Sequence, residues 1–272
     1  MHSSLQLMIT ERCDRRCSGC SAKEHLGKRD MSVERAFDLI HFTDKESITI
    51  LGGEPTLHPD CAQIVRLAAM QTQEGTTRVY TNGANLDAIP QGIADVRVGI
   101  HSWRSGPKAM IDLDVERIAA RDDVTIVVML DKKNVTRLPR IAKAAEEEFK
   151  VSQLYLSSIK RMDKVSFWEP YEDTLTNEEY ATAVTDFVSS YSGGLKIEAA
   201  SRGVLKEEWW WPGHYTSYCR FETRFVDPLK PPVTCPFAIG GGADRSPGEP
   251  CPHSRDGKCV LTKVSFKRRR SR

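Results

Sequence analysis

Three cysteines stand close together near the start of the chain, at Cys13, Cys17 and Cys20. Their C-x3-C-x2-C spacing would also fit one face of a helix, but the residues between them are polar and include a glycine, which disfavours an apolar helical stripe. A structural zinc site needs four ligands, and His25 is the nearest candidate for a fourth. Three thiolates suit an iron–sulfur cubane better, because a cluster without its fourth protein ligand leaves one iron open to another molecule.

A second motif, Gly52-Gly53-Glu54-Pro55, follows an apolar run at Ser47–Leu51. Paired glycines at the end of a strand let the backbone approach a ligand closely, and the proline helps to turn the chain. Taken alone, this pattern is more typical of an ordinary tight turn.

Together, one strand–helix unit apart, the two motifs resemble those of the radical S-adenosylmethionine (SAM) superfamily. The resemblance implies a [4Fe–4S] cluster held by Cys13, Cys17 and Cys20, with SAM chelating the open iron. It assigns the binding of the methionine amino group to Gly52, Gly53 and Glu54. In the family, reduction of the cluster cleaves SAM to methionine and a 5′-deoxyadenosyl radical, which abstracts a hydrogen atom from the substrate. One departure is Gly19, which replaces the aromatic residue usual before the last cysteine and leaves adenine packing to other residues.

Three further positions are similar to cofactor contacts of the family, and each has a structural alternative. Asn82 lies in a Thr-Asn-Gly sequence after the third predicted strand, where Asn-Gly also marks a generic turn. Asn134 follows the fifth predicted strand and could instead cap the next helix. Ser102, after the fourth, carries the weakest signal, and its neighbours His101 and Trp103 could face a substrate or simply pack.

Four more cysteines follow residue 218: Cys219, Cys235, Cys251 and Cys259. This region resembles the SPASM or twitch extensions of radical SAM enzymes, which implies an auxiliary [4Fe–4S] cluster. Zinc is the alternative, His253 could replace one ligand, and two disulfides are disfavoured in a reducing compartment. The remaining cysteine, Cys61, is interpreted as a small core residue.

The elements that must position these residues alternate between strands and helices. Apolar or β-branched runs predict strands at Leu5–Thr10, Ser47–Leu51, Arg78–Thr81, Val96–Ile100, Val124–Leu130, Gln153–Ile159 and Leu195–Ala199. Helical periodicity predicts helices at Ser32–Phe42, His58–Met70, Val115–Ala120, Thr136–Phe149 and Asn177–Tyr191. This alternation indicates an α/β fold with a parallel sheet, and we expect a partial (βα)6 TIM-type barrel with its site at the carboxyl ends of the strands.

We expect three regions: the barrel over 1–200, a cysteine-rich extension over 201–266, and a basic tail over 267–272. The aromatic run Trp209–Trp211 is more typical of packing against a barrel than of base stacking. A net charge of +2 is too small to imply a polyanionic partner for the whole chain. No signal peptide or membrane span is evident, so we expect a cytoplasmic protein.

The functional expectation is therefore a radical SAM enzyme with a one-electron donor such as flavodoxin or ferredoxin. Its substrate could be a peptide, a small metabolite or a nucleic acid. Two alternatives belong to other classes: a non-enzymatic, metal-stapled nucleic-acid-binding protein with zinc at the later cysteines, and an electron-transfer iron–sulfur protein. Neither requires an open iron, and the first leaves the glycine motif unexplained.

Overall fold

The computed structural model describes residues 3–17, 20, 26–41, 47–72, 76–101, 113–158, 173–200, 222–226 and 263–265. The predicted ligands and contacts at Ser102, Cys219, Cys235, Cys251 and Cys259 lie outside these ranges, as do Gly19, Trp103, Trp209–Trp211 and the basic tail.

Within these ranges, nine strands form one sheet in the order β8-β1-β2-β3-β4-β5-β6-β7-β9. Their bounds are β1 Ser3–Met8, β2 Ser47–Leu51, β3 Thr77–Thr81, β4 Asp95–His101, β5 Val124–Leu130, β6 Gln153–Ser158, β7 Lys196–Ala200, β8 Glu222–Val226 and β9 Lys263–Ser265. Strands β1 to β7 follow the chain order and pair in parallel, as does β8 with β1, whereas β9 is antiparallel to β7. All carboxyl ends of β1 to β7 therefore lie at one edge of the sheet.

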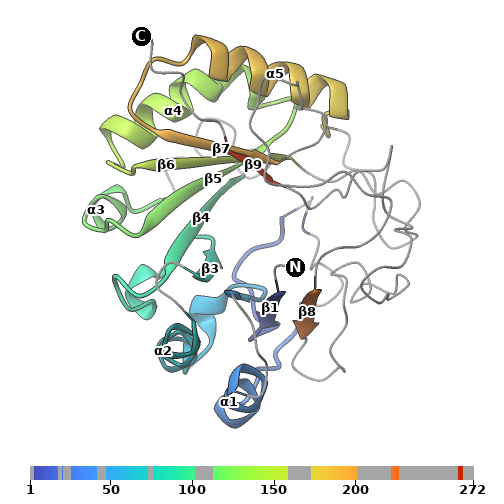
Figure 1. The fold of residues 1–272 in the computed structure, drawn as a ribbon, viewed down its shortest axis with the longest axis vertical. Coiled ribbons are helices and arrows are strands. Elements are labelled where there is room, and N and C mark those ends of the chain that lie inside the picture. Colours follow the sequence, from blue (N-terminus) through green and yellow to red (C-terminus); the bar gives the residue numbers. More distant parts are fainter. Residues whose placement is uncertain are drawn as a thin grey trace.

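Helices follow most of these strands and lie outside the arc that the sheet forms (Figure 1). Their bounds are α1 Val33–His41, α2 Cys61–Gln71, α3 Val115–Ala119, α4 Leu138–Glu147 and α5 Asn177–Ser190. Short 3-10 turns occur at Pro55–Leu57, Leu86–Ala88 and Val135–Arg137. Among the described residues, no helix is long and apolar enough to cross a membrane.

The hydrophobic core lies between the sheet and these helices. In β4, for example, Val96 and Val98 are fully buried members of the core. Because successive side chains of a strand point to opposite faces, Asp95 and Arg97 occupy the other, inner face. Arg97 Nη2 lies 3.8 Å from Glu198 Oε2 of β7, although β5 and β6 separate their strands. That contact requires a sheet that curves toward its inner face, as in a partial barrel.

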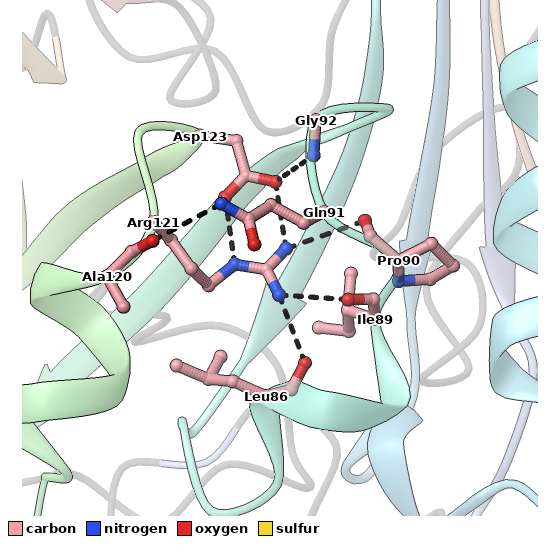
Figure 2. Close-up of polar contacts among 8 residues, drawn as sticks. All are labelled: Leu86, Ile89, Pro90, Gln91, Gly92, Ala120, Arg121 and Asp123. Carbon is pink, nitrogen blue, oxygen red and sulfur yellow. Dashed lines mark hydrogen bonds and ion pairs between the residues drawn. The ribbon is translucent and has the colours of Figure 1, made fainter.

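The opposite edge, at the amino ends of the strands, is held by Arg121 (Figure 2). Its guanidinium donates to Leu86 O at 3.2 Å and Ile89 O at 2.9 Å, and it forms a two-pronged ion pair with Asp123. Asp123 in turn accepts from Gly92 N at 2.8 Å. This network joins the turn before β4 to the turn before β5 at a distance from the predicted site.

The α/β class and the partial barrel are confirmed. Two predicted strands, Ser47–Leu51 and Val124–Leu130, match β2 and β5 residue for residue. Ser32, the first residue of the predicted helix Ser32–Phe42, caps α1, since its Oγ accepts from Arg35 N at 3.2 Å. Strands β8 and β9 come from the region predicted as an extension. They extend the barrel sheet on its two sides, where β8 pairs with β1 and β9 pairs with β7.

Candidate metal and cofactor site

The three clustered cysteines lie in the loop that follows β1, at the carboxyl edge of the sheet. Cys13, Cys17 and Cys20 are all partly exposed and free of disulfides. Arg15 N donates to Cys13 Sγ at 3.4 Å, and Cys20 N donates to Cys17 O at 3.2 Å. The loop therefore already carries a local turn around the thiols and an N–H···S contact of the kind that tunes thiolate ligands.

Paired backbone bonds and ion pairs close this cysteine loop at its base. Glu11 N donates to Arg29 O at 2.9 Å, and the buried Glu11 carboxylate accepts from Arg29 Nε at 2.8 Å. One residue further, Arg12 pairs with Asp30, which also accepts from Thr10 Oγ1 at 2.6 Å. These contacts tie the entry of the loop to its exit, so the thiols project from a fixed base.

The two motif glycines lie directly against this base. A Cβ on Gly52 would stand 2.7 Å from Thr10 O, and one on Gly53 would stand 2.3 Å from Arg12 O. Gly53 N donates to Thr10 O at 2.8 Å, and Glu54 N donates to Arg12 O at 2.7 Å. The glycines thus permit a close approach between two protein segments. One is the turn at Gly52–Pro55, called the glycine turn below, and the other is the cysteine loop.

The Glu54 carboxylate is buried and accepts four hydrogen bonds from the protein itself. Oε1 accepts from the backbone and hydroxyl of Thr56, at 3.2 and 2.7 Å, and from Thr81 Oγ1 at 2.7 Å. Oε2 accepts from Asn82 N at 2.6 Å. The side chain therefore joins the ends of β2 and β3, and Glu54 could serve a cofactor mainly through its backbone.

The two predicted asparagine contacts are also bonded within the protein. Asn82 Nδ2 donates to Asp14 Oδ1 at 2.7 Å, which links the end of β3 to the cysteine loop. Asn134 Nδ2 donates to Met129 O at 2.9 Å, and its Oδ1 accepts from Asp131 N at 2.9 Å. Asn134 occupies the N-cap position of the 3-10 turn that follows, as the capping alternative expects, but its side chain makes no capping bond to that turn.

Burial and neighbouring charges shape the acidity of two cysteines. Burial raises the pKa of Cys13 most, and the nearby Asp14, Glu54 and Cys17 raise it further, against a lowering by the Arg15 N–H. Burial, with a smaller contribution from Glu54, raises the pKa of Cys61 to about 12. Cys61 belongs to the hydrophobic core at the start of α2, which confirms its structural interpretation.

The donor set at this edge fits an iron–sulfur cluster. Within the described ranges, no three His, Cys, Asp or Glu side chains converge on a point that could hold a single metal ion. A cubane does not need such a point, because each thiolate binds a different iron. Three thiols on one loop, without a fourth protein ligand beside them in the described part of the chain, suit a cluster with one open iron.

A polar cluster on the inner face of the sheet was missed from the sequence. The Arg97 guanidinium lies 5.8 Å from the Tyr80 ring centroid and 5.4 Å from that of Tyr155, and it bonds Asp95 at 2.8 Å. Burial alone lowers the pKa of Arg97, but Tyr80, Asp95 and Glu198 outweigh it, so the pKa is raised and the group stays charged. Its Nη1 atom is buried and has no acceptor among the described residues. Alternating polar residues in β4 were the available signal.

Comparison with known proteins agrees with this geometry. Residues 7–129 match the family model described as the radical SAM superfamily. The chain is 37% identical over 94 residues to molybdenum cofactor biosynthesis protein 1 of Bos taurus, a match that covers 31% of this chain and 14% of that protein. It is 31% identical over 104 residues to GTP 3′,8-cyclase of Erythrobacter litoralis, covering 35% of this chain and 31% of the relative. The chain thus spans well under half the length of these relatives.

A solved structure supports the fold over a longer stretch. Streptococcus suis SuiB bound to S-adenosylmethionine aligns with a TM-score of 0.67 at 13% identity, covering 90% of this chain and 62% of SuiB. The matched family region begins in β1 and ends in β5, and it contains both the cysteine loop and the glycine turn. Over residues 7–129, this chain therefore matches the radical SAM superfamily.

Proposed function

We propose that the protein is a radical SAM enzyme whose cluster is held by Cys13, Cys17 and Cys20. When bound and reduced, such a cluster supplies the electron that splits SAM into methionine and a 5′-deoxyadenosyl radical, which takes a hydrogen atom from the substrate. The protein's own part is to hold the three thiols, to present the backbone at residues 52–54 to the cofactor, and to orient the substrate.

The observation that carries this proposal is the contact between the two motifs. The bonds from Gly53 N to Thr10 O and from Glu54 N to Arg12 O, at 2.8 and 2.7 Å, hold the glycine turn against the cysteine loop. A cofactor that bridges an open iron and the glycine turn needs these segments side by side. An electron-transfer protein with a fully ligated cluster would not need that arrangement.

The substrate belongs on the inner face of the sheet in this proposal, near Arg97, Tyr80 and Tyr155. Similarity to GTP 3′,8-cyclase and to SuiB, which was solved with its precursor peptide SuiA, keeps nucleotides and peptides as candidates beside other small metabolites and nucleic acids. A flavodoxin or ferredoxin is the proposed electron donor. These partners, and the cysteine usage, favour the cytoplasm as the compartment.

An auxiliary [4Fe–4S] cluster at Cys219, Cys235, Cys251 and Cys259 is a further part of the proposal. Its support is the sequence: four thiols in a proline-rich region that follows the proposed barrel region 1–200 and extends over residues 201–266. Zinc at the same cysteines is the competing assignment. Iron counting after anaerobic reconstitution separates them, since about eight irons per chain indicate two clusters and about four indicate one.

The central test compares two cysteine substitutions in the reconstituted, dithionite-reduced protein with SAM. We expect Cys17→Ala to abolish 5′-deoxyadenosine formation and to lower bound iron. Cys61→Ala is the matched control, because Cys61 is a core residue, and we expect it to retain both. Unchanged SAM cleavage in Cys17→Ala would overturn the proposal.

Hydrogen abstraction and substrate class need a second experiment. The reduced protein is incubated with SAM and with deuterated candidate peptides, nucleotides or metabolites, and 5′-deoxyadenosine is analysed by mass spectrometry. Deuterium in 5′-deoxyadenosine identifies the substrate. SAM cleavage without transfer from any candidate directs the search to another class.

A further inference from the structure

The amide side chain of Asn82 is held at both ends by protein groups. Its Oδ1 accepts from Ala84 N at 2.9 Å, and its Nδ2 donates to Asp14 Oδ1 at 2.7 Å. A backbone N–H can only donate and an ionised carboxylate can only accept, so these partners fix the orientation of the amide. The Asn82 backbone N–H is bound to Glu54 Oε2 at 2.6 Å, and the residue is only 9% exposed.

The other end of this bond lies inside the cysteine loop. Asp14 directly follows Cys13, and the bond to Asn82 joins positions 68 residues apart. The base of the loop is held by Glu11–Arg29 and Arg12–Asp30, whereas Asp14 lies beyond that base. The bond therefore fixes the segment that carries Cys13 against the end of β3.

We propose that Asn82 and Asp14 are a positioning pair that sets the place of Cys13 relative to the glycine turn. The inference rests on the proposed function, and it gives Asn82 a role other than direct contact with the cofactor. Glu54 completes the arrangement, because it binds the Asn82 backbone while its own backbone N–H binds Arg12 O. Neither Asn82 nor Asp14 has to contact the cluster or SAM for this role.

The pair allows a donor-swap experiment. In Asn82→Asp, two carboxylates face each other and the bond is lost. In Asp14→Asn, the amide oxygen can still accept from Asn82, so the bond is kept. In the double variant Asn82→Asp/Asp14→Asn, the amide introduced at position 14 donates to the carboxylate introduced at position 82, which reverses the direction of the bond. That carboxylate can still accept from Ala84 N.

Two readouts separate positioning from general stability. The first is hydrogen exchange over residues 13–17 in the full metal-free chain, together with its melting temperature. The second is the electron paramagnetic resonance spectrum of the reduced, reconstituted protein with and without SAM. A residue with only a structural role would change the melting temperature and leave the SAM-dependent change in the spectrum intact.

We expect Asn82→Asp to speed exchange in this segment about tenfold, as loss of one charge-assisted bond implies, and to weaken the SAM-dependent spectral change. Asp14→Asn should behave like the parent protein, and the double variant should restore exchange to within about threefold. The inference would be overturned if the double variant exchanged as fast over residues 13–17 as Asn82→Asp does. It would also be overturned if Asp14→Asn exchanged that fast. Parent-like exchange in Asn82→Asp would overturn it as well. If the parent protein itself fails to cleave SAM, the proposed function fails, while the exchange data still decide the pair.

Discussion

Replacing Gly53 by alanine tests whether the missing side chain at this position serves packing within the protein or the approach of a ligand. The three described atoms nearest to a Cβ at this position are all backbone atoms: Arg12 O at 2.3 Å, Arg12 C at 2.8 Å and Glu11 O at 2.9 Å. Backbone cannot rotate away as a flexible side chain can, so the two segments must separate. That separation breaks or stretches the bonds that Gly53 N and Glu54 N make to Thr10 O and Arg12 O.

The expected cost follows from these contacts. Overpacking in a close-packed region costs about 1–3 kcal/mol, and each lost backbone bond adds about 1 kcal/mol. We therefore expect Gly53→Ala to lower the free energy of unfolding by about 4 kcal/mol. For a domain of this size, that corresponds to a fall in melting temperature of about 12 °C.

The assay is thermal unfolding of the metal-free 272-residue chain, with Gly92→Ala as the matched control. Gly92 has a φ of +77°, but a Cβ there would meet no atom of the described residues within 4 Å. Its replacement should cost only the backbone penalty of about 1 kcal/mol, or about 3 °C. If the glycines served only the approach of a ligand, metal-free Gly53→Ala would melt no lower than metal-free Gly92→Ala. A melting temperature of Gly53→Ala equal to or above that of Gly92→Ala would therefore refute the packing argument.

Two other predictions concern the frame around the site. Arg121→Met should lower the free energy of unfolding by about 4 kcal/mol, because it leaves the buried side chain of Asp123 without its cation. Thermal melting should show this loss, while hydrogen exchange over residues 13–17 should stay as in the parent protein. In the loop base, burial raises the pKa of Asp30, but its bonds to Arg12 and Thr10 outweigh this and hold the pKa below its ordinary value of about 3.9. The stabilisation of about 1 kcal/mol is then present above pH 4 and lost as the pH falls through the folded pKa, so urea unfolding of the metal-free chain should show the full deficit of Asp30→Asn at pH 7 and a progressively smaller deficit as the pH is lowered below 4.

The strands and helices that depend on residues close together in the sequence were predicted best. The buried strand Val124–Leu130 is a continuous β-branched and apolar run with polar residues on both sides, and its bounds matched those of β5. Helix starts were less accurate. The helix predicted from Thr136 begins at Leu138, because a 3-10 turn at Val135–Arg137 precedes it and a proline occupies its first turn.

Contacts between distant segments could not be predicted in this way. Nothing local to Glu54 indicates that its carboxylate will bind Thr81 and Asn82, and nothing local to Asp14 indicates an asparagine 68 residues away. The polar cluster around Arg97 on the inner face could have been predicted in part. In β4, Asp95 and Arg97 alternate with Val96 and Val98, and polar residues at period two in a buried strand predict a polar second face.

These contacts also change how the motif residues should be interpreted. The sequence resemblance assigned Gly52, Gly53, Glu54 and Asn82 to the cofactor, but their side chains or missing side chains first serve contacts between loops. The glycine contacts lead to the base of the cysteine loop, and the Asn82 side chain leads to the residue after Cys13, whereas the Glu54 carboxylate joins the ends of β2 and β3. A cofactor that reaches both an open iron and the backbone of the glycine turn depends on the distance between them. In the proposed enzyme, the glycines and Asn82 would influence cofactor binding by setting that distance, without having to contact the cofactor themselves.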